Sequence, residues 1–232
     1  MVQDMLIQGF SFGRLWRYAS AAVKPLTTLF LLLALTACAN VAVDVEDEPE
    51  FVEPPRPAPP ASWPATKKQR EAINSWELRG RLGVQTAETG GSMDLNWRQD
   101  GDEYVIRLLA PMGRGSYLIS GNMQSAIIRM PDGKRRVVEN TASLFQSVLG
   151  VELPVSALRD WVRGVPAASL SLDSISWDEH GLLHVVEQAG WHVEMNNNLG
   201  VKVKLPHKIH LTREDQPELD IRLALRQWMI DN

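Results

Sequence analysis

A short apolar run that ends near the only cysteine of the chain constrains this sequence most. Residues 26–35 are predominantly apolar, but a helix needs about 20 such residues to cross a bilayer. Three basic residues and one acidic residue precede the run. A basic segment followed by a short apolar segment is typical of a secretory signal peptide.

The end of this segment, Leu35-Thr36-Ala37-Cys38, resembles the lipobox of bacterial lipoproteins. In those proteins the thiol receives a diacylglycerol, the peptide is cleaved before the cysteine, and the new amine is acylated. The alternative is an ordinary secretory signal that happens to contain a cysteine. Because no second cysteine is available for a disulfide, we expect residues 1–37 to be a signal peptide. Cys38 is then the lipidated residue, and no other cofactor is expected.

Residues 38–65 have the composition of a tether. Their first half is acidic, and their second half is rich in proline, so this segment should be extended and unpacked. We expect a folded domain over residues 66–232. No aspartate follows Cys38, and in lipoproteins of this type such a start favours the outer membrane, facing the periplasm. The net charge of −4 argues against a nucleic-acid partner, which requires a basic surface.

Most of the folded part shows the alternation of apolar and polar residues that is typical of strands with one buried face. Turn residues such as Gly121-Asn122 and Pro131-Asp132-Gly133 separate these segments. The predicted strands are residues 76–84, 92–99, 103–109, 116–120, 125–130, 134–139, 169–177, 182–188, 191–196, 203–212 and 218–226. In the last of these, Trp228 lies out of phase with the apolar positions, so it is not assigned to the same face.

Short helices are predicted at residues 67–74, 142–149 and 156–163, where apolar residues recur at helical spacing. About eleven strands joined mostly by short turns predict a mainly β fold, a single curved antiparallel sheet or open half barrel. The helices remain to cover its concave side.

The sequence offers no constellation for catalysis or metal binding. It contains neither a glycine-rich phosphate loop nor a nucleophile elbow. His207 and His210 are three residues apart on a predicted strand, so they point to opposite faces and cannot hold one metal ion. We therefore expect neither an enzyme nor a metal site.

Two features suggest contact with apolar ligands. Eight tryptophans either fill a core or line a cavity that the short helices do not plug, and the sequence does not separate these alternatives. Met112 lies in a turn between Pro111 and Gly113, where polar residues are usual. Its side chain either inserts into a membrane or ligand or folds back on the rim of the sheet.

An ordered set of motifs resembles the outer-membrane lipoprotein receptors of the LolB family. These motifs are Trp76-x-x-x-Gly80-Arg81-Leu82, Trp97, Ala110-Pro111-Met112-Gly113, Leu153-Pro154, Leu158-x-x-Trp161-Val162-x-Gly164, Gln188-x-Gly190-Trp191 and Leu205-Pro206. The resemblance implies an eleven-stranded open barrel with a helical lid over an apolar cavity, as in LolA and LolB. It also implies a monomer that takes triacylated lipoproteins from the periplasmic carrier LolA. The receptor inserts them into the inner leaflet of the outer membrane of a Gram-negative bacterium without nucleotide.

In this family the turn matched by Pro111, Met112 and Gly113 carries an exposed leucine that is needed for insertion into the membrane. Methionine at this position is also apolar but more flexible, so we expect the same role. The expected cavity and lid residues are Trp76, Leu95, Trp97, Leu108, Leu144, Val148, Leu158, Trp161 and Trp191. The alternative is a lipid-anchored structural or assembly subunit of the cell envelope with a solid core.

Overall fold

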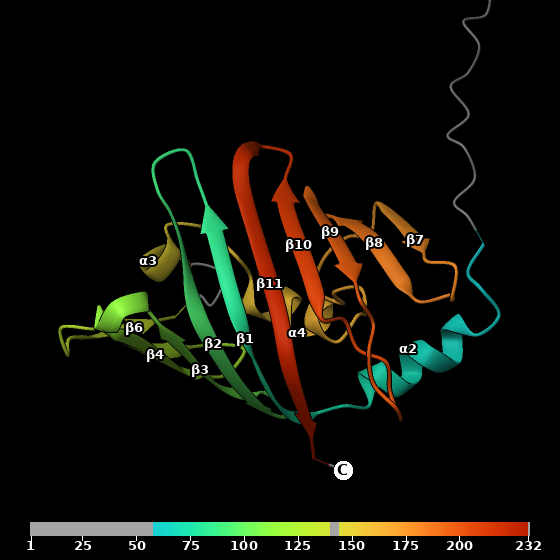
Figure 1. The fold of residues 1–232 in the computed structure, drawn as a ribbon, viewed down its shortest axis with the longest axis horizontal. Coiled ribbons are helices and arrows are strands. Elements are labelled where there is room, and N and C mark those ends of the chain that lie inside the picture. Colours follow the sequence, from blue (N-terminus) through green and yellow to red (C-terminus); the bar gives the residue numbers. More distant parts are fainter. Residues whose placement is uncertain (1–57, 140–143, 232) are drawn as a thin grey trace, which may run out of the picture. The chain divides into compact units, whose positions relative to one another are not determined.

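The computed structural model describes residues 58–139 and 144–231, which form an eleven-stranded antiparallel sheet with short helices (Figure 1). The signal segment, Cys38 and most of the tether lie outside the described residues. The strands are β1 (Ser75–Gln85), β2 (Gly90–Asp100), β3 (Glu103–Leu109), β4 (Ser116–Gly121), β5 (Ala126–Arg129), β6 (Arg135–Val138), β7 (Ser174–Trp177), β8 (Leu183–Gln188), β9 (Trp191–Asn196), β10 (Lys208–Arg213) and β11 (Gln216–Ile230).

Neighbouring strands in the sheet are consecutive in the chain, except that the first strand, β1, lies beside the last strand, β11. β1 to β6 form one meander, β7 to β11 form a second, and β11 pairs with β1. β6 and β7 are the two edge strands of the sheet and do not pair with each other, so the sheet is open between them. The chain between these two strands contains α3 (Gln146–Leu149) and α4 (Val155–Val162). This architecture confirms the predicted open antiparallel sheet.

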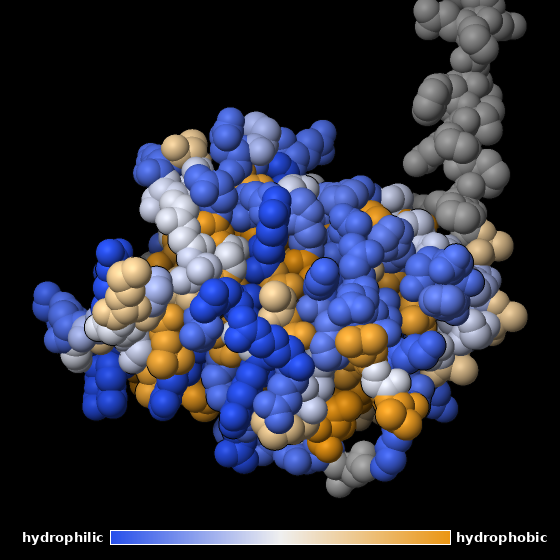
Figure 2. Space-filling view, in the orientation of Figure 1, coloured by the Kyte–Doolittle hydropathy of each residue, from blue (hydrophilic) through white to orange (hydrophobic). Residues whose placement is uncertain are grey.

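Alternating burial along the strands separates a dry concave face from a wet outer face. In β3 every second side chain is buried, beginning with Tyr104, and β11 alternates in the same way from Leu219 to Leu225. The view onto the outer face of β1, β10 and β11 shows a mainly hydrophilic surface (Figure 2). The apolar side chains of both meanders therefore meet on the concave side, in one cluster.

A bulge in the pairing of β1 with β11 changes which residues of β11 face inward. Arg79 pairs with Gln227 whereas Gly80 pairs with Leu225, so Arg226 is the extra residue. Such an insertion shifts the alternation by one. Trp228 thereby reaches the concave side and packs on Trp76, with ring centroids 5.2 Å apart. The alternation of apolar and polar residues in the sequence did not predict that Trp228 lies on the concave side.

Several predicted elements have different bounds in the structure, and three of them differ most at their N-terminal ends. α2 is Trp63–Glu71 rather than residues 67–74, because Pro64 suits the first turn of a helix and the buried Trp63 packs on Trp177 at 6.2 Å. β7 and β10 are shorter than predicted at their N-terminal ends. Before β10, Leu199 and Leu205 pair with each other.

The bulge generates a prediction at Gly80. A Cβ atom at Gly80 would lie 2.3 Å from the carbonyl oxygen of Ala224, whereas at Gly83 the nearest atom is 3.9 Å away. Gly80→Ala should therefore lower the free energy of unfolding by about 1–3 kcal/mol. Gly83→Ala is the matched control on the same strand and should change it by less than about 1 kcal/mol. Equal effects of the two substitutions in urea unfolding would contradict the close approach.

Candidate functional site

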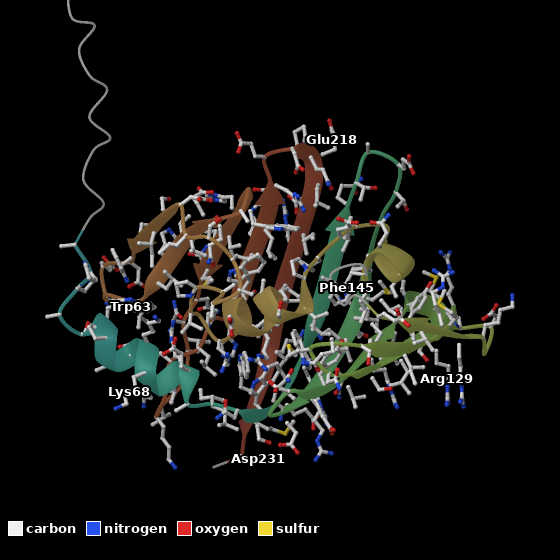
Figure 3. The ribbon with its side chains drawn as sticks, turned by 180° about the vertical axis from the view of Figure 1, so that it is seen from behind. Trp63, Lys68, Arg129, Phe145, Glu218 and Asp231 are labelled. Carbon is white, nitrogen blue, oxygen red and sulfur yellow. The ribbon has the colours of Figure 1, made fainter. Side chains whose placement is uncertain are left out.

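The concave side of the sheet is filled by tryptophan and aliphatic side chains. Trp76, Trp97, Trp161 and Trp191 are each at most 2% exposed. Seen from behind, α4 crosses this side in front of the sheet (Figure 3). The helix presents Leu158 and Trp161 to the cluster because its apolar residues recur on one side.

Aromatic contacts link the sheet and the helix across this cluster. The rings of Trp76 and Trp97 lie 5.0 Å apart on β1 and β2. Trp161 of α4 packs on Trp191 of β9 at 5.9 Å. Both distances are in the range of favourable aromatic pairs. In the described conformation, these four tryptophans fill a core.

All nine residues predicted to line the cavity or its lid belong to this one cluster. Eight of them are buried, and Val148 is half-buried against the rest. The residues are Trp76, Leu95, Trp97, Leu108, Leu144, Val148, Leu158, Trp161 and Trp191. The structure brings them together on the concave side, and their contact with acyl chains stays a prediction.

Gln188 of β8 attaches α4 and the segment after it to the sheet. Its Oε1 accepts hydrogen bonds from Trp161 Nε1 at 3.0 Å and from the backbone N–H of Ala167 at 2.8 Å. Its Nε2 donates to the carbonyl of Ala167 at 2.9 Å. The side chain is 1% exposed, so loss of these bonds would leave buried polar groups without partners.

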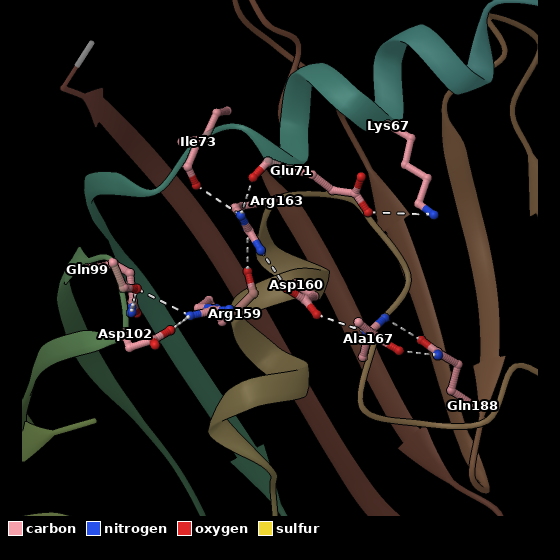
Figure 4. Close-up of polar contacts among 12 residues, drawn as sticks. Lys67, Glu71, Ile73, Gln99, Asp102, Arg159, Asp160, Arg163, Ala167 and Gln188 are labelled. Carbon is pink, nitrogen blue, oxygen red and sulfur yellow. Dashed lines mark hydrogen bonds and ion pairs between the residues drawn. The ribbon is translucent and has the colours of Figure 1, made fainter. Parts of the chain in front are cut away.

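Arg163 makes a second attachment at the C-terminal end of α4 (Figure 4). Its guanidinium donates to the carbonyls of Ile73 at 2.9 Å and Glu71 at 3.3 Å, and it forms an ion pair with Asp160. The other oxygen of Asp160 accepts from the backbone N–H of Ala168 at 3.0 Å. The end of the helix is thereby fixed to the end of α2 and to the segment between α2 and β1.

Arg70 of α2 completes this polar attachment. It is fully buried and donates to the carbonyl of Gly164 at 2.7 Å and of Lys204 at 2.7 Å. Burial lowers the pKa of Arg70 to about 10, which leaves the guanidinium charged at neutral pH. Gly164 has a φ of +74°, and a Cβ there would contact Arg70 Nη1, so glycine is required at this position.

These attachments were not predicted as site residues. Gln188 and Gly164 belong to the motifs that resemble the LolB family, and this resemblance was the only indication in the sequence that they contribute to the site. Arg70 and Arg163 carry no such signal, because their partners are backbone carbonyls from distant parts of the chain.

Four buried side-chain donors have no hydrogen-bond partner among the described residues, and they are Trp76 Nε1, the Tyr104 hydroxyl, Arg159 Nε and Trp177 Nε1. Trp76 and Tyr104 lie directly opposite Gln99 of β2, on either side of it. Burial raises the pKa of Tyr104 to about 12, so the hydroxyl keeps its proton at neutral pH and remains a donor.

The turn after β3 exposes an apolar side chain. Met112 lies in the short helix η1 (Pro111–Gly113) and is 93% exposed. The turn is closed by a hydrogen bond from the N–H of Ala110 to the carbonyl of Gly115 at 3.0 Å. Met112 itself has a φ of +56°, which is uncommon for a residue other than glycine. The side chain projects into solvent, and it does not fold back on the rim.

A metal site is not formed by the described residues. Among them, no three His, Cys, Asp or Glu residues are grouped so that they could hold a metal ion. No helix of residues 58–139 and 144–231 has the length and hydropathy to cross a membrane.

Comparisons with known proteins agree with this arrangement. The family model described as Outer membrane lipoprotein LolB matches residues 74–228. Outer-membrane lipoprotein LolB of Pseudomonas syringae is 34% identical over 170 residues, which cover 73% of this chain and 81% of the relative. The protein of the same name from Halorhodospira halophila is 32% identical over 204 residues, which cover 88% of this chain and 93% of the relative.

Solved structures share the fold at low sequence identity. A LolA superfamily protein from Nitrosomonas europaea is 8% identical with a TM-score of 0.51, over 73% of this chain and 93% of that one. A putative outer membrane lipoprotein-sorting protein domain from Vibrio parahaemolyticus is 10% identical with a TM-score of 0.50, over 73% and 91% of the two chains. Its sequence, its open sheet and these relatives together show that the chain belongs to the LolB family of outer-membrane lipoproteins.

Proposed function

We propose that this outer-membrane lipoprotein receives triacylated lipoproteins from the periplasmic carrier LolA and inserts them into the inner leaflet of the outer membrane. The exposed side chain of Met112 supports this most directly, because an apolar tip on a turn contributes little to a core but can enter a bilayer. The protein acts as a monomer anchored through Cys38.

The transfer follows from the cost of exposing acyl chains to water. Each exposed methylene costs about 0.8 kcal/mol, so a triacylated lipoprotein must be covered while it crosses the periplasm. The concave cluster offers an apolar surface for these chains. Handover then needs only that this surface binds them better than the carrier does, and that the bilayer binds them better still. A nucleotide is not required at this step.

The cluster becomes accessible when α3 and α4 move away from the sheet. Arg163 and the bonds of Gln188 to Ala167 hold the chain at the C-terminal end of α4, so the helix pivots about this end. The bond from Trp161 to Gln188 and the ion pair of Arg159 with Asp102 must break in this movement. Acyl chains would replace Leu158 and Trp161 against the sheet, which keeps the apolar surface covered throughout. Trp76 Nε1 and the Tyr104 hydroxyl, which lack partners when the helix is closed, would donate to ester or amide carbonyls of the bound lipoprotein.

The filled core also fits the second candidate, a lipid-anchored structural or assembly subunit without a ligand site. In that case the tryptophans serve only stability, and α4 never leaves the sheet. The exposure of Met112 favours the transfer role, because a structural subunit gains nothing from an apolar tip in water.

The lipid anchor is tested by Cys38→Ala. Anchoring is expected to depend on the lipid alone, so the processed variant should leave the outer-membrane fraction and appear in the periplasmic extract. Its folded domain should still accept a lipoprotein from the carrier. The measurement is fractionation followed by washing at high salt. Retention of the variant in the washed membrane would contradict anchoring through Cys38.

The movement of α4 is tested by fluorine NMR on protein labelled with 5-fluorotryptophan. Loading with a triacylated lipopeptide should shift the resonances of Trp161 and Trp191, because their contact at 5.9 Å must separate. Trp63 and Trp177, which pack on each other at 6.2 Å, are the internal control and should not shift. Binding of the lipopeptide without any change at Trp161 would favour a core that stays closed.

The exposed turn is tested by Met112→Glu with Met112→Leu as its matched control. A carboxylate at the tip should block insertion, because an unpaired charge in an apolar medium costs several kcal/mol. The variant should accept a lipoprotein from the carrier but not deliver it to liposomes, whereas Met112→Leu should deliver it. Stability should be unchanged in both, because the side chain is 93% exposed. Delivery by Met112→Glu at the rate of the unaltered protein would exclude this role.

A further inference from the structure

The outer face of β3 to β6 carries arginines and apolar side chains in adjacent rows. Arg107 lies opposite Leu118, followed across the sheet by Arg129 and Arg135. In the neighbouring row Val105 is followed by Ser120, Ile127 and Val137. We call this surface the β3–β6 outer face, and it consists of Val105, Arg107, Leu109, Leu118, Ser120, Ile127, Arg129, Arg135 and Val137.

The three arginines of this face have no ion-pair partner within residues 58–139 and 144–231. By contrast, four arginines on the outer side of other strands, Arg79, Arg81, Arg213 and Arg222, each form an ion pair with a carboxylate at 2.6–3.2 Å. Arg98 and Arg226 also lie exposed on β2 and β11 and form no ion pair among the described residues. Figure 3 shows Arg129 on the opposite side of the strands from Phe145, away from the concave cluster. The β3–β6 outer face therefore presents uncompensated positive charge on a chain whose net charge is −4.

The apolar side chains of the face are also unusually exposed. Val105, Leu109, Ile127 and Val137 are between 41% and 67% exposed. Together with Met112 they make up five of the seven large apolar side chains that are exposed in the described part of the chain. Figure 2 shows deep-blue side chains beside orange ones around these strands, at the lower left.

Acidic residues lie at the end of β3 that is far from the Met112 turn, and the arginines lie nearer to the turn. β3 begins at Glu103 and ends at Leu109, directly before the turn that carries Met112. Glu103 pairs with Asp100 of β2 at the far end. Near the turn, the carboxylate of Asp132 is bound to Lys134 at 3.0 Å. The positive, apolar part of the face is thus continuous with Met112.

We propose that the β3–β6 outer face lies against a bilayer surface that contains anionic phospholipid while Met112 is inserted. Guanidinium groups bind phosphate oxygens in pairs, and the aliphatic side chains between them suit the boundary between headgroups and acyl chains. This inference rests on the proposed insertion of Met112. In addition to that insertion, the arginines fix the orientation of the domain on the bilayer. The concave side then opens toward the part of the membrane where the lipoprotein is released.

The contact needs only modest affinity, because the lipid on Cys38 already holds the domain near the membrane. Attachment through the same chain makes the contact intramolecular, which raises its effective concentration. Each arginine near an anionic surface adds about fivefold to the population in contact. Three arginines are thus sufficient to orient the domain, and their effect should weaken with salt because exposed charges are screened.

The test uses the lipidated full-length protein in proteoliposomes. Cys38 is the only cysteine of the chain and its thiol is acylated, so an introduced cysteine is a unique labelling site. Ser120→Cys places an NBD fluorophore on the β3–β6 outer face, and Ser174→Cys on β7 is the matched exposed control. In vesicles of phosphatidylethanolamine with phosphatidylglycerol, the label at position 120 should shift to the blue and be quenched by brominated lipid. The label at position 174 should do neither.

Charge variants identify the cause of the shift. Arg107→Gln with Arg129→Gln and Arg135→Gln should abolish the blue shift at position 120 and slow delivery to liposomes, without reducing receipt from the carrier. The control variant Lys68→Gln with Lys208→Gln and Arg226→Gln has the same net charge at other exposed positions and should retain the shift. Circular dichroism should verify that both variants are folded.

Three outcomes would overturn the proposal. In the first outcome, the label at position 120 stays in water although delivery is normal. In the second outcome, its blue shift is equally large in vesicles without phosphatidylglycerol. In the third outcome, the arginine variant loses receipt but keeps the shift, which would assign the face to the carrier protein. Failure of receipt and delivery in the unaltered protein would instead contradict the proposed function itself.

Discussion

The antiparallel pairing of β1 with β11 is the interaction on which the rest of the sheet depends. It runs from Trp76 opposite Ile230 to Gln85 opposite Asp220 and joins two meanders that the chain otherwise links only through α3 and α4. The bulge at Gly80 lies in this pairing and increases the local bend. It brings Trp228 onto Trp76, so the aromatic centre of the concave side exists only when the two halves are joined.

The molecule contains two kinds of apolar surface, of which one is covered and the other is exposed to solvent. The concave cluster is large and is covered by α3 and α4. α4 is attached near its C-terminal end through Arg163 and Gln188, and in its middle through Arg159, which forms an ion pair with Asp102 at 3.1 Å. The turn at Met112 is small enough to remain exposed without a cover. A transfer protein requires both, because the first must shelter acyl chains and the second must meet the membrane before release.

Much of this fold could be predicted from the sequence, because half-buried strands show a period of two. β3 agrees with the prediction at both ends, since every second side chain is buried. The predicted start of β10 was wrong, because Leu199 and Leu205 pair with each other before it. The place of Met112 in a turn between Pro111 and Gly113 was predicted, but these residues left open whether its side chain projects or folds back on the rim, and only the family resemblance favoured exposure. The attachments of Arg70 could not be predicted, because its carbonyl partners lie more than ninety residues away in the chain.

The gap in the sheet between β6 and β7 has a consequence for how cargo is accommodated. In a closed barrel, the number of strands and their stagger fix the bore, and anything inside must pass through an end. A sheet that begins at one strand and finishes at another has no fixed circumference. In the proposed transfer, its curvature can therefore adjust to three acyl chains or to two. A polypeptide attached to the bound lipid would then leave sideways through the gap between β6 and β7, without being threaded.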